Sequence, residues 1–73
     1  MPPVPPMSGK EVVKVFESLG WRFKRQAGSH LIMAKTGERA TLAIPNHKEV
    51  AKGTLRGIIR TANMTVDEFL AAI

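Results

Sequence analysis

Few residues in this chain are able to carry chemistry, and the two histidines stand out among them. The 73 residues include His30 and His47, no cysteine, no tyrosine and a single aspartate, Asp67. Imidazole has an unperturbed pKa of about 6.5, so it can give and take protons near neutral pH. The sequence has no phosphate-binding glycine loop and no carboxylate pair at a catalytic spacing. Any catalysis must therefore rest mainly on histidine.

The same inventory gives little support to a metal site or to a second nucleophile. Two histidines seventeen residues apart, without cysteine, form a poor ligand set, so we expect no metal and no cofactor. Ser29 has no recognisable base and orienting group beside it, which favours hydrogen bonding in a turn over nucleophilic attack.

The charge of the chain is strongly positive and unevenly distributed. The net charge is +5, and the stretch from Trp21 to Arg60 contains nine Lys and Arg residues but only two glutamates. A basic surface of this kind attracts polyanions, of which nucleic acid is the commonest. A basic surface that serves only solubility is the alternative.

Each histidine sits beside a turn or loop signal. His30 follows Gly28-Ser29 at the start of an expected strand, where alternation with the apolar Leu31 places it on the outer face. The expected basic neighbours on that face are Arg22, Lys24 and Arg39. An exposed imidazole among cations is well placed beside a phosphate, although it could equally be an ordinary surface histidine. His47, in the Pro45-Asn46-His47 loop, is expected to fix the backbone or to act as a secondary catalytic group.

A helix followed by three strands is expected to position these residues. Ser8 and Glu11 form a capping box that starts a helix from about Gly9 to Leu19. Period-two patterns then predict strands at 21–26, 29–35 and 39–44, with Trp21 and Phe23 facing inward. The short links between them indicate an antiparallel meander.

Two helices follow the strands. One has a buried stripe of Leu55, Ile58, Ile59 and Ala62, and its exposed flank carries Lys52, Arg56 and Arg60. A short last helix starts at Thr65, where a second capping box begins. Amphipathic helices packed on one face of a three-stranded sheet give an α+β two-layer sandwich.

The expected organisation is one domain with a short leader. Residues 1–7 contain four prolines and are expected to be a disordered, proline-rich leader, which leaves residues 8–73 as a single domain. No apolar run is long enough for a membrane span, so we expect a cytoplasmic protein that does not bind membranes.

Four sequence segments, in order, carry a resemblance to a known family. They are S-G-K-E-V-V-K-V-F-E-S-L-G-W, R-Q-A-G-S-H, I-P-N-H, and K-G-T-L-R-G-I-I-R-T-A with a trailing D-E-F-L. At this spacing the chain resembles the HicA family, the small mRNA-cleaving toxins of HicA–HicB toxin–antitoxin pairs. The resemblance implies a fold like that of the double-stranded-RNA-binding domain, a type II toxin with endoribonuclease activity resting on His30, and a HicB-like antitoxin that covers His30.

A metal-independent mechanism is consistent with this implication. The 2′-hydroxyl of RNA can attack the adjacent phosphorus once a base removes its proton, and His30 would be that base or the acid for the leaving oxygen. Arg22, Lys24 or Arg39 would stabilise the added negative charge, and Gly28 and Ser29 would hold the turn. The row of Lys52, Arg56 and Arg60 is expected either to contact RNA phosphates or to be a solvated helix face. The alternative functions are a non-catalytic RNA-binding module and a domain whose positive face docks an acidic protein.

Overall fold

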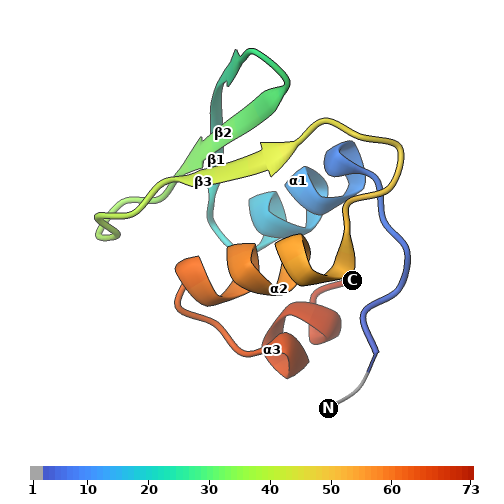
Figure 1. Ribbon diagram of the computed structural model, residues 1–73. Helices are drawn as coiled ribbons and strands as arrows, with labels where there is room; N and C mark the ends of the chain where they lie inside the picture. Colours follow the sequence, from blue (N-terminus) through green and yellow to red (C-terminus); the bar gives the residue numbers. More distant parts are fainter. Residues whose placement is uncertain (1–2) are drawn as a thin grey trace.

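Local signals set the element boundaries in the computed structural model, which describes residues 3–73. The elements in chain order are α1 (Gly9–Ser18), β1 (Arg22–Ala27), β2 (His30–Ala34), β3 (Leu42–Pro45), α2 (Lys52–Thr61) and α3 (Val66–Ala71). The strands form one antiparallel sheet in the order β1-β2-β3, with the helices on one side of it (Figure 1). The expected α+β architecture is confirmed. None of the helices in the described part of the chain is long and apolar enough to cross a membrane.

Both expected capping boxes are present. Ser8 Oγ accepts a hydrogen bond from the Glu11 N–H, and Glu11 Oε1 accepts one from the Ser8 N–H, at 3.1 and 2.9 Å. Thr65 and Glu68 repeat the arrangement at the start of α3, at 3.1 and 2.8 Å. Each box satisfies two N–H groups that a helix start would otherwise leave unpaired.

The capping carboxylates make stability depend on acidity. Hydrogen bonds from the backbone and then the side chain of Ser8 hold the pKa of Glu11 below its usual value of 4.5, and Thr65 lowers the pKa of Glu68 in the same way. A depressed pKa in the folded state contributes stability that is present above the unfolded pKa and is lost as pH falls through the folded one. We expect the free energy of unfolding, measured by urea denaturation, to decrease from about pH 4.5 downward.

A double variant isolates this contribution. Glu11→Gln with Glu68→Gln keeps a side chain that can accept the capping hydrogen bonds but does not titrate. Its free energy of unfolding should therefore fall less steeply than that of the wild type between pH 5 and pH 3. Parallel curves for the two proteins would contradict the prediction.

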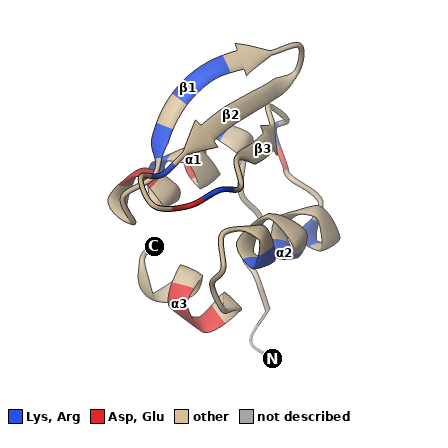
Figure 2. Ribbon diagram, turned by 90° about the vertical axis from the view of Figure 1, so that its left-hand side faces the viewer, with Lys and Arg blue, Asp and Glu red and all other residues tan. Residues whose placement is uncertain are grey.

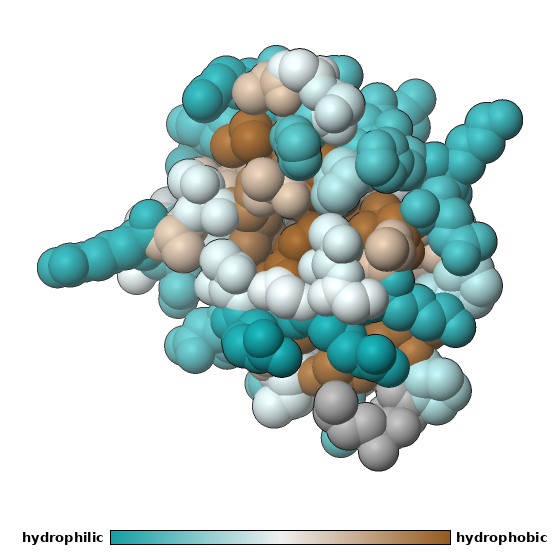
Figure 3. All heavy atoms as spheres, in the orientation of Figure 1, coloured by the Kyte–Doolittle hydropathy of each residue, from teal (hydrophilic) through white to brown (hydrophobic). Residues whose placement is uncertain are grey.

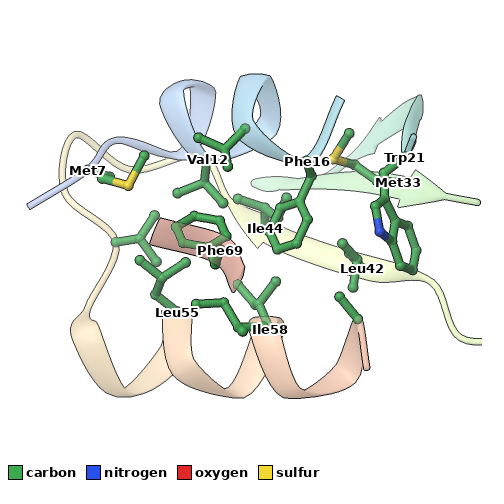
Figure 4. Packing of buried hydrophobic residues seen from close by; sticks show 14 of the residues in the cluster. Met7, Val12, Phe16, Trp21, Met33, Leu42, Ile44, Leu55, Ile58 and Phe69 are labelled. Atoms are coloured by element: carbon green, nitrogen blue, oxygen red, sulfur yellow. The ribbon is translucent and has the colours of Figure 1, made fainter. Parts of the chain in front are cut away.

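The core lies between the sheet and the helices. Leu31, Met33, Leu42 and Ile44 point inward from β2 and β3 and are nearly fully buried, as the alternation predicted. Phe16 of α1 meets Phe69 of α3 at a ring-centroid distance of 5.2 Å and Trp21 edge-on at 6.2 Å. Figure 4 shows Phe16 and Phe69 in the layer between α1 and α2. The expected stripe of Leu55, Ile58, Ile59 and Ala62 on α2 is also buried.

The edge strand departs from the expected pattern. Trp21 is 2% exposed, but its expected inward partner Phe23 is 46% exposed. Every residue of β1 is exposed, because β1 is an edge strand whose hairpin with β2 extends beyond the helices (Figure 1). Phe23 does pair with the buried Met33 and so lies on the inner face as expected, but the helices do not cover it.

The proline-rich segment and the third strand also differ from expectation. Of the expected disordered leader, Met1 and Pro2 lie outside the described residues. Val4 and Met7 are buried in the core, and the Met7 carbonyl accepts a hydrogen bond from the Val50 N–H at 2.8 Å. Two apolar side chains, each next to a proline, bury enough surface to hold an already stiff segment. The third strand begins at Leu42 rather than at 39, because β2 pairs with β3 only from Met33 back to His30.

Candidate active site

His30 stands at the hairpin end of the sheet. Gly28 adopts a φ of +59°, which favours glycine, and its carbonyl accepts a hydrogen bond from Gln26 Nε2 at 2.9 Å. The chain then turns through Ser29 into β2, whose first residue, His30, lies between Ala27 of β1 and Pro45 of β3. His30 is exposed, whereas Leu31 is only 7% exposed. The expected outward position is confirmed, so the imidazole is open to solvent.

Arg25 is the cationic residue that the strand register brings nearest to His30 on the outer face. A β-bulge interrupts the pairing of β1 and β2 between Phe23 and Arg25. Simple alternation would point Arg25 inward, but after the bulge it pairs with Ile32, two residues from His30 on the same face. Diagonal neighbours of this kind have Cα atoms roughly 7–8 Å apart, within reach of an arginine side chain. Sequence reasoning missed Arg25, because nothing in the local pattern marks a bulge.

The other expected cations of the sheet lie farther away. Arg22 pairs with Ala34 and so shares the outer face, but at the opposite end of β2 from His30. Lys24 is the unpaired residue of the bulge, and Arg39 lies in a bend beyond the end of β2. Because a strand rises about 3.3 Å per residue, the far end of β2 is roughly 13 Å from His30. The structure therefore does not place Arg39 beside His30 as the sequence analysis expected.

The basic row of α2 belongs to a different layer. Lys52 and Arg60 are exposed, whereas Arg56 is half-buried and its Nε atom has no hydrogen-bond partner within residues 3–73. α2 packs under the inner face of the sheet, so its basic row and His30 do not share a surface. Figure 2 shows the charged segments of β1 and of α2 on these separate layers.

His47 lies in a loop that is fastened to the His30 end of the sheet. The Asn46 N–H donates to the Ser29 carbonyl at 2.8 Å, and the Gly9 N–H donates to the His47 carbonyl at 2.9 Å. A Cβ atom at Gly9 would overlap the Pro45 carbonyl oxygen, so this close approach requires glycine. His47 is exposed and lines a pocket of about 220 Å³ with Lys10 and Lys48.

The chain is similar to known proteins over most of its length. The family model of HicA toxins of bacterial toxin–antitoxin systems matches residues 9–64, which include the Gly28-Ser29-His30 turn and the Pro45-Asn46-His47 loop. The chain belongs to the HicA toxin family. This HicA-family chain is also similar to a chain from a toxin–antitoxin complex of Streptococcus pneumoniae, with 43% sequence identity and a TM-score of 0.70. That similarity covers 81% of this chain and all of the other one. No curated protein matched the chain.

Two other kinds of site could contribute chemistry to the HicA-family chain: a metal site and a second hollow with reactive groups. Within residues 3–73, no group of three His, Cys, Asp or Glu side chains is placed to hold a metal ion. A hollow of about 350 Å³ lies between β3 and α2, where Figure 3 shows apolar surface. Its walls are mainly small side chains, including Thr54, Gly57 and Thr61, and they carry no titratable group. On the outer face of the sheet, the strand register therefore brings together one exposed imidazole, His30, and one guanidinium group, Arg25.

Proposed function

We propose that this HicA-family chain is the toxin of a type II toxin–antitoxin system and acts as a metal-independent endoribonuclease that cleaves mRNA. The observation that carries the proposal is the exposed imidazole of His30 at the hairpin end of the sheet, with Arg25 on the same face. Membership of the HicA toxin family supports it.

The proposed reaction uses the ribose as its own nucleophile. His30 removes the proton of a 2′-hydroxyl, the O2′–P bond forms as the P–O5′ bond breaks, and the departing O5′ takes up a proton from water or a conjugate acid. The products are a 2′,3′-cyclic phosphate and a 5′-hydroxyl end. Arg25 stabilises the negative charge that builds on the phosphate oxygens, the role that the sequence analysis gave to Arg22, Lys24 or Arg39.

A cleavage assay with matched substrates tests this reaction. The purified protein should cut a single-stranded RNA in the presence of EDTA and leave 5′-hydroxyl ends. The same strand with a 2′-deoxyribose at the cleaved position should stay intact there, because it lacks the nucleophile. Cleavage of the deoxy strand, or cleavage only with added divalent metal, would contradict the mechanism. RNA that is bound but never cut would indicate a non-catalytic RNA-binding module.

A protein partner is part of the same proposal. The similar chain from Streptococcus pneumoniae was solved in a toxin–antitoxin complex. We therefore infer that a HicB-like antitoxin binds this chain and covers His30, since an exposed imidazole is easily blocked by a partner. Adding purified antitoxin at a one-to-one ratio should stop cleavage.

A further inference from the structure

Two neighbouring hollows lie along the flank of α1, beside the hairpin that carries His30. The first, which we call the α1 groove, is a cavity of about 440 Å³ with an apolar floor of Val13, Phe23 and Leu31. The second, the loop pocket, has a volume of about 220 Å³ and is lined by Lys10, His47 and Lys48. Lys10 and Asn46 line both hollows, so the two are neighbours. The α1 groove by itself is in the size range of a small-ligand site.

The chemistry of the two hollows differs in a way that fits a nucleotide. The α1 groove offers the exposed ring of Phe23 and the side-chain amide of Gln26, which suit the flat face and the polar edge of a base. Lys14 and Glu17 also line it and carry opposite charges. The loop pocket brings together two lysines and a histidine, and among the described residues no carboxylate lines it. The ring and the amide of the α1 groove match the base of a nucleotide. The cations of the loop pocket match its phosphate.

The site is also connected to His30. Pro45 is the strand partner of His30, and the next residue, Asn46, is bonded to the Ser29 carbonyl. Paired Cα atoms in an antiparallel sheet are about 4.5–5.5 Å apart, and consecutive ones 3.8 Å, so Asn46 lies within roughly 9 Å of His30. A strand anchored at Asn46 can pass over this edge of the sheet to the imidazole.

We propose that the α1 groove and the loop pocket bind one unpaired nucleotide of the RNA, with its base against Phe23 and its phosphate between Lys10 and Lys48. This inference rests on the proposed function, because it assigns the substrate site next to the cleaved bond. A base in a duplex is stacked on both faces and cannot enter the groove, so the site selects single-stranded RNA. Phe23 is thus a binding residue, although the sequence pattern indicated only that it faces inward.

Binding of a short RNA tests the site without depending on cleavage. The probe is a fluorescent single-stranded RNA pentamer with 2′-deoxyriboses throughout the cleavable positions, and the measured quantity is its dissociation constant. Phe23→Ala should weaken binding at least about fivefold, as expected for the loss of one stacked base. Phe23→Tyr should restore binding, whereas Phe23→Leu, which keeps apolar volume but has no ring, should not. Ile73→Ala, which removes an exposed apolar side chain elsewhere, should bind as the wild type does.

A second substrate locates the base. For the wild type, the same pentamer with one abasic nucleotide should bind more weakly than the intact pentamer. For Phe23→Ala, the two pentamers should bind equally well, because the ring and the base act as a pair. The double variant Lys10→Gln, Lys48→Gln should bind both pentamers more weakly than the wild type does, and its affinity should depend less on salt concentration. Unfolding measured in parallel shows whether each variant is folded.

The outcomes separate this inference from the proposed function. Wild-type cleavage with unchanged pentamer binding by Phe23→Ala would overturn the nucleotide site and leave the ribonuclease intact. Pentamer binding that depends on Phe23 in a protein that cuts no RNA would overturn the ribonuclease and support the nucleotide site. If Phe23→Ala weakens only the binding of the antitoxin, the groove serves a protein partner and the nucleotide site is wrong.

Discussion

Replacing His30 by alanine is expected to lower the rate of RNA cleavage by a factor of about 10² to 10⁴, the usual contribution of a general acid or base. The imidazole is the proton-transfer group of the proposed reaction, and within the described chain the only other histidine, His47, lies in the loop that begins beyond Pro45. The change should leave the free energy of unfolding within about 0.5 kcal/mol of the wild type, because His30 is exposed. Single-turnover cleavage of a labelled RNA, measured beside urea denaturation, tests both expectations.

Two further variants sharpen the test. His30→Gln keeps hydrogen-bonding atoms but cannot exchange a proton near neutral pH, so it should be as inactive as His30→Ala. Both should still bind the deoxy-substituted pentamer, since Arg25 and the lysines of the loop pocket remain. Undiminished cleavage by either variant would show that His30 is not the proton-transfer group. Loss of RNA binding along with cleavage would instead make His30 a binding residue.

Replacing Phe69 by alanine is expected to destabilise the fold by about 3–5 kcal/mol. Phe69 is fully buried, and its ring lies 5.2 Å from that of Phe16, so its removal leaves a cavity at the centre of the core. A 73-residue domain has a total stability of roughly 4–11 kcal/mol. The loss is therefore a large fraction of the total stability, and the variant should unfold at a markedly lower temperature and urea concentration than the wild type.

This expectation concerns a part of the chain outside the family match. The match ends at residue 64, whereas α3, from Val66 to Ala71, follows it. Thermal and urea denaturation followed by circular dichroism measure the effect, and Ile73→Ala, at a side chain 62% exposed, should change stability by no more than about 0.5 kcal/mol. Equal stability of the two variants would show that α3 is an appendage and not part of the core.

The elements predicted best are those whose cause is local. The capping boxes at Ser8 and Thr65 involve residues three positions apart, so the sequence contains both partners of each hydrogen bond. The inward positions of Leu31 and Met33 follow from strand alternation in the central strand, which is paired on both edges. The outward position of His30 follows from the same alternation.

The features predicted least well depend on partners far away in the chain. The exposure of Phe23 depends on how far the helices reach under an edge strand, and the outward position of Arg25 depends on a bulge against β2. The burial of Val4 and Met7 depends on a core assembled from later segments. Lys10 and Lys48 come from segments far apart in the sequence, and only the packing of α1 against the loop brings them to one pocket.

By itself, the sequence determined the order of the elements, the outward position of His30 and the excess of positive charge, because each depends on residue type and short-range spacing. Only the tertiary structure decided which cations surround His30 and which residues form a groove beside it. The physical reason is that strand register and helix docking are set by burial summed over the whole core, and a shift of one residue in either changes which face a side chain occupies.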